Sequence, residues 1–230
     1  MSQSMKVAYS LVLGAWMALL AWGILSLIGY GTIGNVYLRA VVSGGIVGLL
    51  AGAAIAALEK YNSTAKIGST LFGGGIGIVT GFIGGTVGLL VAEFLFQSVP
   101  LSGIAQEGLR LIGWGIFGLG VGVGPGLATG SLLKSAWSSA GGCLGGLIGG
   151  GVFILLGALF TTFALTASAI GFTLLGLFVG MFIAFGQEVG KQAQLKITEQ
   201  RIGTKPEEGR LFNVFKKKVS IGKADRKSVV

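Results

Sequence analysis

Residues that commonly perform catalysis are scarce in this chain. It contains no histidine, one cysteine (Cys143) and one aspartate (Asp225). A histidine general base, a histidine- or cysteine-rich metal site and an internal disulfide are therefore excluded. Four glutamates lie near the ends of apolar segments and form no acid–base constellation: Glu59, Glu93, Glu107 and Glu188. We expect no enzymatic activity, no metal and no cofactor.

Three charged residues suggest a different chemistry, the binding of a transported ion or molecule. Arg39, Arg110 and Glu93 adjoin long apolar segments, and charges buried within a membrane often mark a substrate pathway. Their positions at segment ends also fit anchoring at the membrane surface, which costs little free energy, and we favour that interpretation. No acidic residue falls near a predicted bilayer midplane, where a proton- or cation-coupled transporter would carry one.

One glycine motif has the spacing of a dinucleotide site. The sequence GWGIFG at 113–118 fits the pattern G-x-G-x-x-G, which binds a pyrophosphate when it joins a strand to a helix in reach of water. Neither a preceding strand nor water access is predicted here. We interpret the match as a result of glycine density.

The composition is that of a membrane protein. Hydrophobic residues make up 52% of the chain, charged residues only 11%, and 44 of the 230 residues are glycine. No charged residue occurs in 67–92, 111–133 or 135–187, whereas a helix needs about 20 apolar residues to cross a bilayer. The sequence therefore predicts an all-α, polytopic membrane protein whose first partner is the lipid bilayer.

Six membrane-crossing helices are predicted, followed by a tail. The expected crossings are 7–29, 38–58, 67–92, 109–132, 135–159 and 166–187, with a loop at 133–134. We expect a membrane domain at 1–190 and a tail at 191–230. Lysines at 6, 60, 66 and 134 would share the side of the basic tail, and this bias places both termini in the cytoplasm. A bacterial inner membrane is the expected location.

The chain contains two similar segments. RAVVSGGIVGLLAG, starting at Arg39, resembles RLIGWGIFGLGVG, starting at Arg110, and the segments that begin at Lys66 and Lys134 also align. Each unit would be a helix pair that crosses the membrane twice. The sequence thus predicts two parallel helix-pair repeats, at about 39–97 and 110–160, unlike the inverted repeats of many transporters.

Glycine recurs at every fourth residue in four of the predicted helices. This spacing places glycines on one helix face, where they let a neighbouring backbone approach closely. We expect this glycine-zipper packing to hold the bundle together, with a glycine-lined pore as the alternative. The predicted packing positions are Gly44, Gly48, Gly52, Gly73, Gly77, Gly81, Gly85, Gly118, Gly122, Gly126, Gly130, Gly141, Gly145 and Gly149.

The tail has a different character. From residue 188 to 230 it holds 11 lysines and arginines against five acidic residues, a balance that attracts anionic lipid. Its short apolar alternations predict two strands, with Phe212 and Val214 on one face of the first and Val219 and Ile221 on one face of the second. The lysines at 216–218 would then decorate a hairpin.

The tail sequences LKITEQRIG and EEGRLFNVFKKKVSIGK resemble the opening strands of a forkhead-associated (FHA) domain. The whole chain is similar to bacterial glycine-zipper membrane proteins that carry such a domain at the C-terminus. The resemblance implies a β-sandwich that binds phosphothreonine peptides through an arginine after Ile-Gly and a later serine. Here Ile221 and Gly222 match and Lys223 occupies the arginine position, whereas the Ser-x-x-His and asparagine parts of the pattern do not occur in this sequence. We therefore expect an incomplete FHA-like segment, from a fragment of a longer protein or as a remnant.

Two functions follow as hypotheses. The first is a non-enzymatic membrane scaffold that anchors the FHA-like module in the cytoplasm for signalling. Its partner is a phosphorylated cytoplasmic protein if the FHA domain is complete, with Lys223 as the phosphopeptide-binding residue. The second is a small channel or transporter formed by the glycine-rich bundle, in which several copies of the chain could supply the pore. Nucleic acid is not an expected partner.

Overall fold

The computed structural model describes residues 3–190, 193–196 and 211–214. The chain divides into two compact units, Met1–Val189 and Gly190–Val230. The first unit contains long α-helices joined by short connections, two of which are 3₁₀ turns. These elements are α1 (Gln3–Leu27), η1 (Tyr30–Thr32), α2 (Val36–Thr64), α3 (Ile67–Ser98), α4 (Ile104–Thr129), α5 (Leu132–Leu159), η2 (Thr161–Phe163) and α6 (Ala164–Val189).

The prediction of six apolar helices is confirmed. Within the described residues, six helices are long and apolar enough to cross a membrane, which fits an integral membrane protein. Several helices run beyond the apolar segments, because a helix continues until a cap ends it. The loop expected at 133–134 is wrong: the Ser131 side chain accepts a hydrogen bond from the backbone of Lys134 and starts α5 at Leu132.

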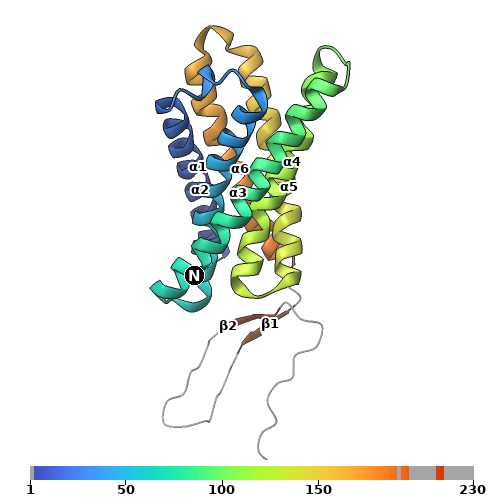
Figure 1. Cartoon of the computed structure of the whole chain (residues 1–230). Coiled ribbons are helices and arrows are strands. Elements are labelled where there is room, and N and C mark those ends of the chain that lie inside the picture. Colours follow the sequence, from blue (N-terminus) through green and yellow to red (C-terminus); the bar gives the residue numbers. More distant parts are fainter. Residues whose placement is uncertain (1–2, 191–192, 197–210, 215–230) are drawn as a thin grey trace, which may run out of the picture. The chain divides into compact units, whose positions relative to one another are not determined.

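Successive helices run antiparallel and stand side by side (Figure 1). The segments at 28–35, 99–103 and 160–163 form what we call the upper end of the bundle. The turns at 65–66 and 130–131 form the lower end, together with the start of α1 and the end of α6.

The helices contribute unequally to the core. Its buried side chains come from α1, α2, α4 and α6 and include Leu25, Ile55, Phe117 and Leu175. Helix α3, in contrast, buries only glycines and one alanine, Ala92. Helix α5 buries glycines, serines and a single lysine. Helices α3 and α5 therefore pack largely through their backbones and turn most of their large apolar side chains outward, with Leu89, Phe153 and Ile154 as exceptions that pack against the core.

Glycines set the distance between α2 and α3. Gly48 faces Gly81 so closely that a Cβ atom on either residue would collide with the carbonyl oxygen of the other. The same mutual contact joins Gly44 to Gly85 and Gly52 to Gly77. Such close approach increases dispersion contacts between helices, which hold them together where the surrounding lipid is as apolar as the side chains.

Similar contacts join the other neighbouring helices. Gly118 on α4 meets the carbonyl of Gly142 on α5, and Gly122 meets Ser138. Gly14 on α1 meets Gly176 on α6. Among the remaining packing positions predicted from sequence, Gly73 contacts the side chain of Lys60, Gly126 contacts Ser135, Gly141 and Gly145 contact α6 at residues 182 and 178, and Gly149 contacts Leu175.

Gly130 has a different role from the one predicted. No atom outside its immediate neighbourhood lies within 4 Å of a Cβ placed there, and its φ is +71°. Gly130 ends α4 in the left-handed conformation, which glycine adopts without a steric penalty. It is a helix cap, although it continues the four-residue spacing.

The second unit contains two short strands, β1 (Ala193–Lys196) and β2 (Leu211–Val214). They pair antiparallel, with Ala193 opposite Val214 and Lys196 opposite Leu211. Strand β2 coincides with the first strand predicted in the tail. The second predicted strand, around Val219 and Ile221, lies outside the described residues.

The glycine contacts predict a sharp difference between two substitutions. Gly48→Ala should lower the free energy of unfolding by about 1–3 kcal/mol, because the new methyl group has no space between α2 and α3. Gly75→Ala is the matched control, since nothing lies within 4 Å of a Cβ at that exposed position of α3. Unfolding of the purified protein by sodium dodecyl sulfate measures both. Equal stability of the two variants would contradict this packing.

Candidate functional site

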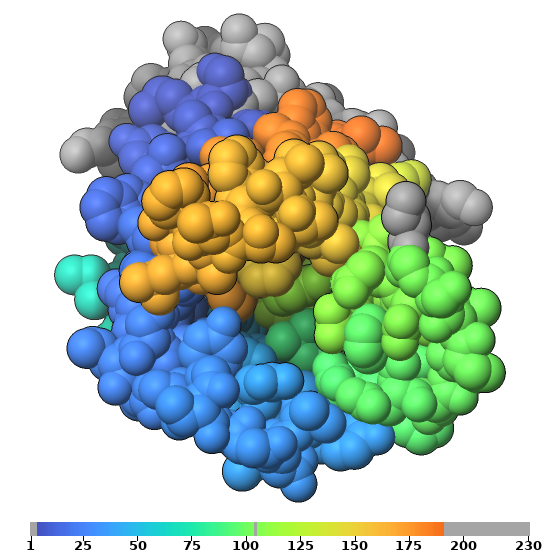
Figure 2. Space-filling view, turned by 90° about the horizontal axis from the view of Figure 1, so that it is seen from above, coloured from blue at the N-terminus to red at the C-terminus, as the bar shows by residue number. Residues whose placement is uncertain are grey.

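A cavity of about 580 Å³ lies at the upper end of the bundle. Figure 2 views this end and shows it hollowed between the blue N-terminal helices, the gold segment before and within α6, and the green α3–α4 region. The cavity has the size of ordinary small-molecule sites. It is lined by Tyr30, Gly31, Val36, Arg39, Ala40, Ser43, Leu89, Ala92, Glu93, Glu107, Arg110, Trp114, Phe153, Ile154, Gly157, Ala158 and Phe172.

Arg110 is held on one wall by two partners. Its Nη1 atom donates to both carboxylate oxygens of Glu107, at 3.0 and 3.1 Å. Its guanidinium carbon lies 3.7 Å from the centroid of the Phe96 ring, within the range of a cation–π interaction. Both charged side chains remain more than one-third exposed. The charge of Arg110 is therefore already compensated by Glu107.

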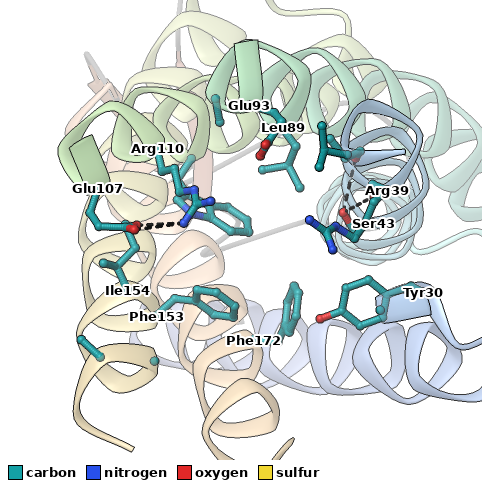
Figure 3. A pocket seen from close by; sticks show the side chains of 17 residues that line it. Tyr30, Arg39, Ser43, Leu89, Glu93, Glu107, Arg110, Phe153, Ile154 and Phe172 are labelled. Carbon is teal, nitrogen blue, oxygen red and sulfur yellow. Dashed lines mark hydrogen bonds and ion pairs between the residues drawn. The ribbon is translucent and has the colours of Figure 1, made fainter. Parts of the chain in front are cut away.

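Arg39 and Glu93 line the same cavity but, unlike Arg110 and Glu107, do not form an ion pair with each other. Figure 3 shows the guanidinium group of Arg39 directed into the cavity, across from that of Arg110. Glu93 accepts a hydrogen bond of 2.8 Å from the neutral amide of Gln97. Both residues are half-buried. Neither side chain has an ion-pair partner within the described part of the chain.

Aromatic rings form the apolar wall. Trp114 and Phe172 are buried, and Phe153 packs between them, with ring centroids 5.6 Å from Trp114 and 5.0 Å from Phe172. The steep interplanar angle of 68° between Phe153 and Phe172 is an edge-to-face arrangement, which aromatic pairs favour. One side of the cavity can thus accept an apolar group while the other carries charges.

Local structure positions the charged side chains. The Asn35 side chain accepts hydrogen bonds from the backbone amides of Tyr37 and Leu38 and caps α2, so that Arg39 lies in the first turn of this helix. Arg110 lies further along α4, one turn after Glu107. This separation of three residues brings the Arg110 and Glu107 side chains together on the helix surface.

A second group of charges lies at the lower end. The Nζ atom of Lys134 on α5 pairs with Oε1 of Glu59 on α2, and both residues are at least nine-tenths buried. The two residues are 75 positions apart in sequence, so the pair links the hairpin formed by α2 and α3 to the hairpin formed by α4 and α5. A buried charge without its partner is strongly destabilising, and this pair therefore constrains where the end of α2 lies relative to the start of α5.

The structure revises the chemistry expected from sequence. Arg39, Arg110 and Glu93, for which anchoring at the membrane surface was favoured, line one cavity together with Glu107. The motif GWGIFG lies inside α4. The Glu59–Lys134 pair was missed, because Lys134 was assigned to a loop. A usable signal was present: Glu59 and Lys134 each lie about one turn inside the lower end of an apolar helix.

The lining of the cavity combines charged and aromatic groups. Within the described ranges, no group of three or more His, Cys, Asp or Glu side chains is placed to hold a metal ion. Cys143 lies within α5, half-buried, as a free thiol. The cavity offers cations, carboxylates and aromatic rings, which can recognise a charged molecule with an apolar portion.

The buried pair predicts a non-additive response to mutation. Glu59→Gln and Lys134→Met should each lower the free energy of unfolding by about 3–5 kcal/mol, because each removes the ion-pair partner of a buried charge. The double variant should be more stable than either single variant. Thermal unfolding of the detergent-solubilised protein measures all three, and Lys66→Met, at an exposed position of the same end, is the control. Strictly additive losses would show that the two charges do not stabilise each other.

Comparisons of the chain with protein-family models, with curated proteins and with solved structures find no match. The likeness of the tail to an FHA domain therefore stays a prediction from residues 195–223. Lys223 lies outside the described residues.

Proposed function

We propose that this chain is a non-enzymatic integral membrane scaffold of a bacterial inner membrane, whose bundle anchors a cytoplasmic recognition segment. The observation that carries the proposal is the packing of the bundle. Backbone contacts at glycines join α2 to α3, α4 to α5 and α1 to α6, and residues such as Leu175 and Val121 fill the centre. Such packing suits a rigid anchor.

The proposal includes a glycine-zipper fold built from two helix-pair repeats. The hairpins α2–α3 and α4–α5 have corresponding features: each pairs an inner helix with an outer helix that packs through glycine. Gly48 and Gly118 occupy corresponding positions and contact Gly81 and Gly142 on the outer helices. Both units cross the membrane in the same direction, which supports parallel repeats.

Orientation follows from the distribution of lysine. Lys60, Lys66 and Lys134 lie at the lower end of the bundle. Positive charge accumulates on the cytoplasmic side of membrane proteins, so the lower end and both termini are assigned to the cytoplasm. The cavity at the upper end then faces the opposite side of the membrane.

The tail gives the scaffold its proposed partner, a cytoplasmic protein phosphorylated on threonine. The support is the resemblance of the tail to the opening strands of an FHA domain, with Lys223 where the phosphate-binding arginine is expected. Lysine keeps the positive charge that a phosphate requires but lacks the two-pronged donor geometry of arginine. We therefore assign Lys223 to phosphate binding through charge.

This assignment predicts phosphate-dependent binding by the full chain in lipid nanodiscs. Phosphothreonine peptides from a degenerate library should bind about tenfold more tightly than the unphosphorylated peptides, since an ionised phosphate makes strong charge-assisted hydrogen bonds. Lys223→Gln should abolish the difference, whereas Lys205→Gln, the same change elsewhere in the tail, should preserve it. Fluorescence anisotropy measures the binding. Equal affinity for both peptide forms would refute phosphopeptide recognition.

The upper cavity favours a second candidate function, a channel or transporter. The cavity opens at one end of the bundle and is lined by four charged residues, as expected for a substrate entrance. The rate at which ions or small solutes cross the membrane of liposomes that contain the full chain distinguishes the two functions. A scaffold leaves flux at the level of empty vesicles, and a rise above that level supports transport.

A further inference from the structure

We propose that the upper cavity binds a zwitterionic molecule with an apolar portion. Its anionic group pairs with the guanidinium of Arg39, its ammonium group faces the carboxylate of Glu93, and its apolar portion packs on Trp114, Phe153 and Phe172. This site is distinct from the phosphopeptide recognition proposed above. It holds whether the bundle only binds this molecule or also transports it.

The balance of charges in the cavity favours a ligand that carries both a positive and a negative group. Two cations and two anions line it, so their formal charges cancel. Arg110 and Glu107 already pair with each other, which leaves one cation, Arg39, and one anion, Glu93. A ligand with both charges can compensate both residues and keep the site neutral. A purely anionic ligand would leave the Glu93 charge uncompensated in a half-buried site, at a cost in free energy.

The guanidinium group of Arg39 is suited to bind the anionic group of the ligand. The guanidinium group of arginine presents parallel N–H donors that match the two oxygens of a carboxylate or phosphate. Arg39 presents this group to the cavity (Figure 3), and among the described residues no carboxylate lies within ion-pair distance of it. Arg110 is fixed nearby by Glu107 and Phe96, and its positive charge adds to the attraction for an anion.

The aromatic wall of the cavity offers a surface for the apolar portion of the ligand. Trp114 is 6% exposed and Phe172 is 3% exposed, so these rings are fixed in the core while the cavity borders them. An apolar portion of the ligand gains contact there without the ordering of flexible side chains. The volume of about 580 Å³ accommodates a molecule with both a charged head and an apolar group.

Two sources could supply this chemistry. One is a free zwitterion, such as an aromatic amino acid, that enters from the aqueous phase. The other is the head of a zwitterionic phospholipid, in which a phosphate and an ammonium group are separated by a few bonds. Both present an anion and an ammonium group together, and two binding experiments distinguish them.

Calorimetric titration of the full chain in phosphatidylglycerol nanodiscs tests the free source. The probes are L-phenylalanine, 3-phenylpropionate, which lacks the ammonium group, and 2-phenylethylamine, which lacks the carboxylate. L-Phenylalanine should bind at least about tenfold more tightly than either analogue, because loss of one charge leaves a partner unpaired.

Native mass spectrometry tests the lipid source. The full chain is extracted from membranes that contain equal amounts of phosphatidylethanolamine, which carries an ammonium group, and phosphatidylglycerol, which does not. Preferential retention of phosphatidylethanolamine identifies the lipid headgroup as the ligand. A preference in either experiment supports the proposal and names the source.

Two cavity variants and one control decide whether the binding belongs to this site. Arg39→Gln should weaken binding of the preferred ligand by about tenfold or more, and Glu93→Gln should remove the preference for a ligand with an ammonium group. Lys66→Gln, an equivalent loss of charge at the lower end, should change neither. If Arg39→Gln fails to fold, the result for Glu93→Gln alone shows whether the ligand binds in the upper cavity. Absence of any preference in both experiments, or a preference that survives in Glu93→Gln, overturns the proposal.

Discussion

The fold depends on direct contact between helix backbones at glycine. A helix in lipid gains little from burying leucine against leucine, because the surrounding lipid tails offer the same environment. Gly48 and Gly81 remove the side chains from the contact, so that each carbonyl lies where the other residue would carry its Cβ. Close packing of this kind gains dispersion energy over the full length of a helix pair. The same constraint explains why α3 can bury almost nothing except glycine.

The two groups of charges divide between the ends of the bundle. At the lower end, Glu59 and Lys134 are buried together, and they join the two hairpins through a pair that tolerates no loss of one partner. At the upper end, the charges remain half-buried and surround a cavity. The lower pair therefore constrains where α2 lies relative to α5, while the upper charges line an open cavity.

Much of the fold could be predicted from the sequence, because long uncharged segments and the four-residue glycine spacing follow directly from the physics of a helix in lipid. The ends of the helices could not, since a cap such as Ser131 depends on one side-chain hydrogen bond. The four-residue spacing was also misleading at Gly130, where the backbone conformation decides the role.

The candidate site was predicted only in part. Arg39 and Arg110 stood out in the similar segments that open the two hairpins, but sequence position alone does not show whether an arginine faces lipid headgroups or a cavity. That distinction requires the packing of five helices around one space. The partnership of Glu59 with Lys134 likewise depends on contact between helices from different hairpins, which local patterns do not encode.

Thiol labelling tests most directly whether the bundle spans the membrane with its two ends on opposite sides. In a Cys143→Ala background, single cysteines are placed at Ser102, exposed at the upper end, and at Lys66, exposed at the lower end. A membrane-impermeant maleimide should label Ser102→Cys in spheroplasts and Lys66→Cys only after the membrane is opened. Labelling of both positions from the same side would contradict a spanning bundle. The reverse pattern would contradict the cytoplasmic placement of the termini.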